Sequence, residues 1–96
     1  MANSMIRKSV AAGAATEFKF GVRSCVFLVK NMTEGNVFVS FGENPGSTDK
    51  MILIPPGTWQ RHVCLHDSGE LASCDTVFVV GSCEPGDGVE VECLRW

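Results

Sequence analysis

Apolar and polar residues alternate along most of the chain after residue 16. Phe18 and Phe20 alternate with Glu17 and Lys19, and the run VEVEC at 89–93 is the cleanest alternation in the sequence. A period of two puts apolar side chains on one face of a β-strand and polar side chains on the other. No segment shows the sustained i, i+3, i+4, i+7 spacing of an amphipathic helix. The pattern therefore predicts an all-β protein.

Strand-length apolar segments recur between clusters of turn residues. We expect strands at 18–20, 25–29, 37–41, 51–54, 59–65, 76–80 and 89–93. The sequence Pro55-Pro56-Gly57 ends one of them, because proline cannot donate to a ladder and Gly57 suits a turn position with positive φ. About seven short strands at this spacing predict an antiparallel β-sandwich or jelly roll. A small barrel is the alternative, and the sequence does not separate the three.

The first 16 residues lack this alternation. Residues 1–8 are polar and mixed, and residues 10–15 are small and alanine-rich, with Gly13 interrupting the run. Such a segment offers little apolar surface to bury, so we expect a flexible, extended or poorly ordered N-terminal arm. A chain of 96 residues has room for one domain. The expected organisation is an arm over 1–16 and a single β-sandwich domain over 17–96.

Composition and charge exclude several classes of partner. The net charge is −3 and no basic stripe is present, so a nucleic-acid partner is not expected. No stretch approaches the roughly 20 apolar residues of a membrane span, so no membrane partner is expected either. The hydrophobic fraction of 45% is high for so small a domain. Either some apolar surface is buried against another subunit, or the chain simply has a valine-rich β core.

Histidine and cysteine offer candidate zinc ligands, whereas Glu84 and Asp87, which could bind calcium weakly, are expected to be ordinary turn residues. His62, Cys64 and His66 alternate along one expected strand, which places them on one face about 6.5–7 Å apart. The chain lacks the C-x₂₋₄-C pairs usual in structural zinc sites, so these three are weak candidates and we expect no metal and no cofactor. The five cysteines cannot all pair internally. Reduced thiols are expected, with a Cys83–Cys93 disulfide as an alternative.

Catalytic chemistry finds little support. Glu90 and Glu92 share one face of a strand, opposite Val89 and Val91, and we interpret them as a solvated strand face instead of an acid–base pair. Ser68 is not in a G-x-S-x-G elbow, and both histidines are on one strand. We therefore expect a protein that is not an enzyme, with no catalytic residue.

Two tryptophans leave a binding function open. Trp59 and Trp96 are candidates for a carbohydrate-stacking platform. Tryptophan more often caps a core or lies at a protein–protein interface. A small carbohydrate- or protein-binding module is therefore the alternative function. A small cupin-like, metal-dependent protein that uses His62, Cys64 and His66 is a further one.

From about Thr16 to Trp96 the chain resembles small structural proteins of tailed phages and prophages. The resemblance is carried by the strand and turn at 26–31, the strand closing on phenylalanine and glycine at 37–42, the IPPGTW turn at 54–59, and the last strand at 89–95. It implies a non-enzymatic subunit of capsid decoration, head fibre or tail, working through protein–protein contacts. Its partners would be itself or other virion proteins, and its location the virion after synthesis in the bacterial cytoplasm. The arm would order on binding.

Overall fold

The computed structural model describes residues 5–82 and 88–95. These residues form eight β-strands and one short 3-10 helix, and no α-helix occurs among them. The elements are β1 (Met5–Lys8), β2 (Ala15–Ser24), β3 (Val26–Asn31), β4 (Val37–Phe41), η1 (Thr48–Lys50), β5 (Ile52–Ile54), β6 (Trp59–Val63), β7 (Cys74–Gly81) and β8 (Val89–Arg95). The all-β prediction is confirmed. Each of the seven expected strands is present, with ends shifted by a few residues.

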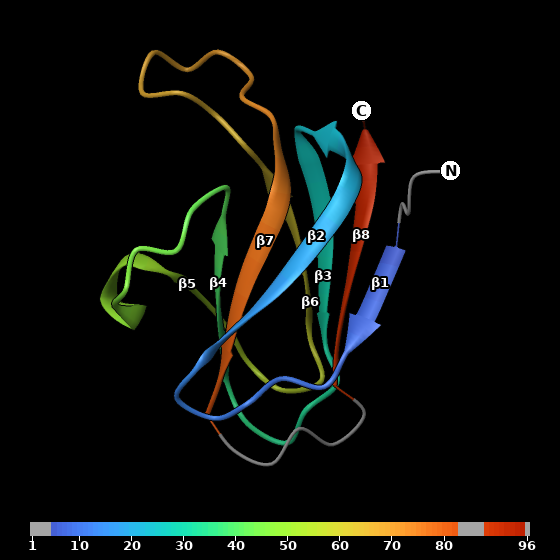
Figure 1. The fold of residues 1–96 in the computed structure, drawn as a ribbon, viewed down its shortest axis with the longest axis vertical. Coiled ribbons are helices and arrows are strands. Elements are labelled where there is room, and N and C mark those ends of the chain that lie inside the picture. The colour runs from blue at the N-terminus through green and yellow to red at the C-terminus, as the bar shows by residue number, and fades with distance from the viewer. Residues whose placement is uncertain (1–4, 83–87, 96) are drawn as a thin grey trace.

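The strands pair as a long ribbon folded back on itself. Antiparallel partners are β1 with β8, β2 with β7, β3 with β6, and β4 with β5. Pairing of β3 with β8 and of β4 with β7 then divides the ribbon into two four-stranded sheets. Sheet A has the order β1-β8-β3-β6 and sheet B the order β2-β7-β4-β5 (Figure 1). Eight strands nested in this way form a jelly roll, the arrangement that the sequence had left open beside the sandwich and the barrel.

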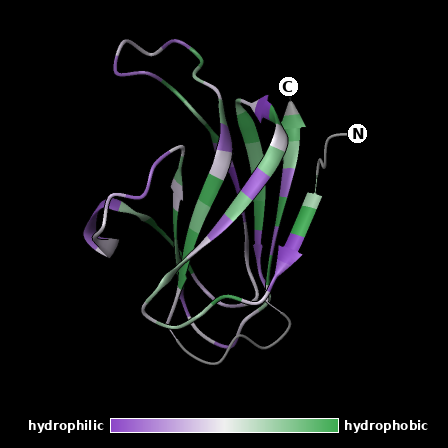
Figure 2. Cartoon of the chain, viewed as in Figure 1, coloured by the Kyte–Doolittle hydropathy of each residue, from purple (hydrophilic) through white to green (hydrophobic). Residues whose placement is uncertain are grey.

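The core lies between the two sheets and takes the inward half of every alternation. Figure 2 shows the alternation of apolar and polar residues along β2. The inward residues Phe18, Val29, Val79 and Val91 are fully buried. Phe27 from sheet A joins the layers, since its ring lies 5.3 Å from that of Phe41 in sheet B. Burial of these side chains is the main stabilising contribution to the fold.

A buried asparagine, Asn31, is the last residue of β3. Asn31 is 1% exposed, and its Nδ2 donates hydrogen bonds to the carbonyls of Ile54 and Gly35 at 2.9 and 2.8 Å. Its Oδ1 accepts from the backbone N–H and the hydroxyl of Thr33 at 2.9 and 2.7 Å. One side chain thus ties the turn after β3 to the end of β5, and its hydrogen-bonding groups are satisfied, as burial requires.

The N-terminal segment is a correction to the expected arm. Residues 5–8 form β1 on the edge of β8, and Val10 is 1% exposed in the core. Ala12 then bridges Gly81 of β7. A Cβ on Gly81 would lie 3.0 Å from the carbonyl oxygen of Ala11, so glycine allows this close approach. Backbone pairing holds the segment although it has few apolar side chains, and the domain includes residues 5–16.

We predict that Val10→Ala lowers the free energy of unfolding by about 2 kcal/mol, because it removes two buried methyl groups and leaves a cavity. Met5→Ala truncates an exposed apolar side chain of the same segment and is the matched control, with an expected change within about 0.5 kcal/mol. Urea unfolding followed by circular dichroism measures both. Equal stability of Val10→Ala and the unaltered protein would show that the segment is not part of the cooperative domain.

Candidate functional site

The structure does not gather the three weak metal candidates. His62 lies in β6 and stacks on Phe41, with ring centroids 4.1 Å apart and planes 8° from parallel. Burial lowers the pKa of His62. Cys64 follows it on the inward side and is buried. β6 ends at Val63, so His66 lies beyond it in an exposed turn. The His66 carbonyl accepts a hydrogen bond from Gly69 N–H at 2.8 Å. The expected strand to residue 65 is too long, and the alternation fails at His66.

No three histidine, cysteine, aspartate or glutamate side chains come together to hold a metal ion in the part of the chain that the structure describes. The cupin-like alternative needs such a cluster. The described cysteines are free thiols. Cys83, one half of the alternative disulfide, lies outside the described residues.

Four thiols lie near one another at one end of the sandwich. A folded sandwich was expected to let Cys74 and Cys93 approach the strand that carries Cys64, and Cys25 is the member that the sequence did not indicate. Cys25 lies in the turn between β2 and β3, and its carbonyl accepts a hydrogen bond from Cys64 N–H at 2.8 Å. Cys74 begins β7 opposite Ser24. Cys93 pairs with Phe27 near the end of β8. Burial raises the pKa of Cys93 to about 11, although a hydrogen bond with Ser24 works against it.

The outer face of sheet A carries a charged row across its strands. Register places Arg7, Glu90, Lys30 and Trp59 side by side on β1, β8, β3 and β6. Arg7 Nη2 donates to Glu90 Oε1 at 2.9 Å, and Lys30 Nζ donates to Oε2 at 3.0 Å. Hydrogen bonds from Lys30 and then Arg7 lower the pKa of Glu90 despite its desolvation.

This arrangement corrects the expected role of Glu90. The alternation identified its face correctly, since Val89 and Val91 point into the core. The expectation of a solvated carboxylate is wrong, because the Glu90 side chain is only 5% exposed. Glu90 lies on the outer face of the sheet and not in the core, so the basic side chains of the two neighbouring strands are what shield its carboxylate from water. A carboxylate held between two cations is a structural ion pair and has no free face for acid–base chemistry.

Trp59 ends the charged row at the edge of sheet A. Its side chain is 68% exposed, so it does not cap the core. Lys30 Nζ lies 5.0 Å from the centre of its ring, within cation–π range. A hollow of about 170 Å³ lies beside it, lined by Lys30, Asn31, Met32, Gly57, Thr58 and Trp59. Trp96, its expected partner in a platform, lies outside the described residues.

The outer face of sheet B carries an apolar row. Register aligns Ala15 with Val80, Val80 with Phe38, and Phe38 with Leu53, so the row crosses all the strands of the sheet. Leu53 at its edge is 49% exposed. We call these four residues the apolar row. Outward sheet positions facing water are normally polar.

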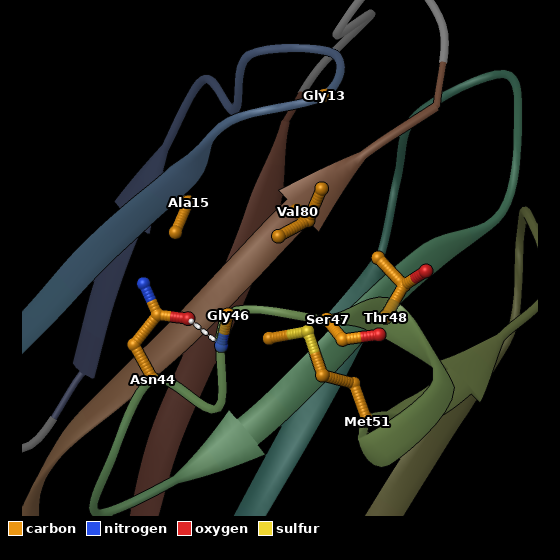
Figure 3. A pocket seen from close by; sticks show the side chains of 8 residues that line it. All are labelled: Gly13, Ala15, Asn44, Gly46, Ser47, Thr48, Met51 and Val80. Atoms are coloured by element: carbon orange, nitrogen blue, oxygen red, sulfur yellow. Dashed lines mark hydrogen bonds between the residues drawn. The ribbon is translucent and has the colours of Figure 1, made fainter.

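A hollow adjoins the apolar row. It has a volume of about 150 Å³ and lies between β2, β7 and the 42–51 loop (Figure 3). Its lining residues are Gly13, Ala15, Asn44, Gly46, Ser47, Thr48, Met51 and Val80. Asn44 Oδ1 accepts a hydrogen bond from Gly46 N–H at 3.0 Å, which shapes the loop at its rim. The surface of sheet B is therefore apolar along the row and recessed beside it.

We predict that Glu90→Gln lowers the free energy of unfolding by about 1 kcal/mol at neutral pH, because both ion pairs lose their charge. The folded-state pKa of Glu90 is depressed, so its contribution is present above about pH 5 and is lost as the pH falls through the folded pKa. Urea titrations at several pH values measure the difference. Glu92→Gln, flanked in register by Met5 and Leu28, is the matched control. A destabilisation by Glu90→Gln that persists unchanged in acid would contradict the ion-pair explanation.

Among residues 5–82 and 88–95, no helix is long and apolar enough to cross a membrane. Comparison of the chain with known protein families, curated proteins and solved structures finds no match.

Proposed function

We propose that this chain is a non-enzymatic structural subunit of a phage or prophage particle, acting in capsid decoration or tail assembly. The observation that carries the proposal is the apolar row on sheet B. Its partners are other copies of itself or other virion proteins, which bury the row. It is located in the virion after synthesis in the bacterial cytoplasm.

The apolar row has the properties of a contact surface. Ala15, Val80, Phe38 and Leu53 form one continuous line across a sheet face, instead of scattered exposed residues. Contiguous apolar patches on small proteins mark interaction sites. Glu17 and Ser40 flank Phe78 in the adjoining row, so polar groups border the apolar line, as at the rim of an interface.

The fold is compatible with this proposal and does not decide it. Jelly rolls occur in viral capsid proteins, in lectin domains and in cupins. A fold hosts many functions, so surfaces and sites must separate these classes. Support for a cupin-like protein would have to come from a metal cluster, and His62, Cys64 and His66 do not come together. The apolar row therefore carries more weight for the structural subunit.

We predict that the untagged protein, prepared with reductant, forms a symmetric oligomer in native mass spectrometry. Leu53→Lys places an ammonium in the contact and is expected to raise the dissociation constant at least about tenfold. Leu65→Lys, at an even more exposed leucine outside the apolar row, is the matched control and should assemble normally. If both variants assemble like the unaltered protein, or if the protein is a monomer that binds no virion component, the apolar row is not a contact surface.

A second candidate function is a carbohydrate-binding module, favoured by the exposure of Trp59 beside its hollow. An exposed indole at a sheet edge offers a stacking surface for a sugar ring. At its border, Lys30 supplies a hydrogen-bond donor, and the Thr58 hydroxyl, which donates to the Pro55 carbonyl at 2.7 Å, supplies an acceptor.

If the protein is a carbohydrate-binding module, we expect Trp59→Ala to abolish the binding of neutral oligosaccharides, as measured by calorimetry. Leu53→Lys leaves that binding unchanged, since Leu53 belongs to the other sheet. A glycan panel that gives no heat with the unaltered protein excludes the carbohydrate module.

A further inference from the structure

Two of the four gathered thiols lie against each other in an open hollow. The hollow has a volume of about 210 Å³ and includes Cys64 and Cys74 in its lining, with His62 and Phe41 beside them. A hydrogen bond between the two thiols shifts their pKa values in opposite directions. A disulfide needs the two Cα atoms within roughly 7 Å of each other. Both cysteines line the same hollow at the base of the hairpin that the 65–73 segment forms, which favours such an approach. Cys74 is partly exposed in this hollow, so a small disulfide has access to its sulfur, whereas Cys64 is buried behind it.

The backbone around the pair is already held in place. Cys64 O accepts a hydrogen bond from Ala72 N–H at 2.9 Å, and Leu65 bridges Leu71, so the 65–73 loop returns as a narrow hairpin. Cys74 begins β7 and is paired with Ser24. The loop projects from one end of the sandwich in Figure 1. A Cys64–Cys74 bond would therefore close the base of an existing hairpin without moving a strand.

The surroundings give the two sulfurs different roles. The hydrogen bond from Cys64 lowers the pKa of Cys74 to about 7, with help from the Thr76 backbone and the Arg23 charge and against desolvation and the Asp75 carboxylate. The same hydrogen bond raises the pKa of Cys64. Arg23 is held there because its Nε donates to Ser73 Oγ at 3.2 Å. Cys74 is thus the thiolate and nucleophile, and Cys64 retains the proton.

We propose that Cys64 and Cys74 form a reversible disulfide by exchange with low-molecular-weight disulfides. The Cys74 thiolate attacks one sulfur of the disulfide RSSR and expels RS⁻, which gives a mixed disulfide on Cys74. Cys64 then loses its proton and attacks the Cys74 sulfur, which expels the second RS⁻. The dithiol is oxidised by two electrons, RSSR is reduced, and the two cysteine protons end on two RSH molecules.

The other described cysteines are less suited to this exchange. Cys93 is buried, and its pKa is raised to about 11, so little thiolate is present at neutral pH. Cys25 lies close to Cys64 through a backbone hydrogen bond, so a Cys25–Cys64 bond is the competing product. The inference does not depend on the proposed function. Disulfides persist outside the reducing cytoplasm, so the bond would form after the protein leaves it.

The test uses the full chain, reduced and then incubated with oxidised glutathione at neutral pH. Remaining thiols are blocked with N-ethylmaleimide in acid. Cleavage after Glu70 and Asp75 separates Cys64, Cys74 and Cys83 into different peptides for mass spectrometry. We expect a Cys64–Cys74 linked peptide, with Cys25 and Cys93 alkylated. A dominant Cys25–Cys64 peptide, or no linked peptide containing Cys74, overturns the proposal.

Melting temperature gives a second readout that does not depend on mapping. Closing the 65–73 loop is expected to raise the midpoint by roughly 10 °C on oxidation. Cys64→Ser and Cys74→Ser should each remove this rise, while Cys25→Ser, the matched control, should keep it. Reduced samples of all three show whether a variant merely fails to fold. A rise that survives in Cys74→Ser, or disappears in Cys25→Ser, assigns the bond to other cysteines and overturns the proposal.

Discussion

The insertion of β8 between β1 and β3 is the constraint on which the rest of the structure depends. It brings the first and last strands, β1 and β8, together in one sheet and places Val89 and Val91 in the core. Gly88, at positive φ, directly precedes this strand and lies so close to the Lys8 carbonyl that no Cβ fits between them. On the outer face, Glu90 is held by a cation from each neighbouring strand. The N-terminal segment is therefore part of the domain and not an attachment to it.

Side-chain alternation predicted the strands because the inward positions must be apolar. It could not predict which strands pair, since pairing is set by backbone hydrogen bonds that leave no mark on composition. This is why the sequence could not distinguish the jelly roll from a sandwich or a barrel. It is also why β1, whose half-buried apolar residue is Ile6, was expected to be part of a flexible arm. Glu90 illustrates the same limit. Its face followed from the period of two, but its partner Arg7 lies 83 residues away.

The candidate sites depend on register as well. Cys25, Cys64, Cys74 and Cys93 follow no metal-ligand spacing, and they meet because the ends of several strands share one edge of the sandwich. The apolar row left a weak signal. Phe38 lies at an outward position of an expected strand and is apolar where a polar residue is usual. The sequence contained this anomaly, but only the pairing of β7, β4 and β5 aligns Phe38 with Val80 and Leu53.

The two outer faces of the jelly roll differ in chemistry. Sheet A presents charges that satisfy one another, with an exposed indole at its edge, whereas sheet B presents the apolar row. A subunit that buries sheet B against a neighbour leaves sheet A in water, where Arg7 keeps its hydration. The thiol pair lies at the end of the sandwich where β6 and β7 meet the 65–73 loop, outside both faces. If the chain assembles through the apolar row as proposed, the Cys64–Cys74 hollow would stay open to solvent, so that the proposed oxidation could follow assembly.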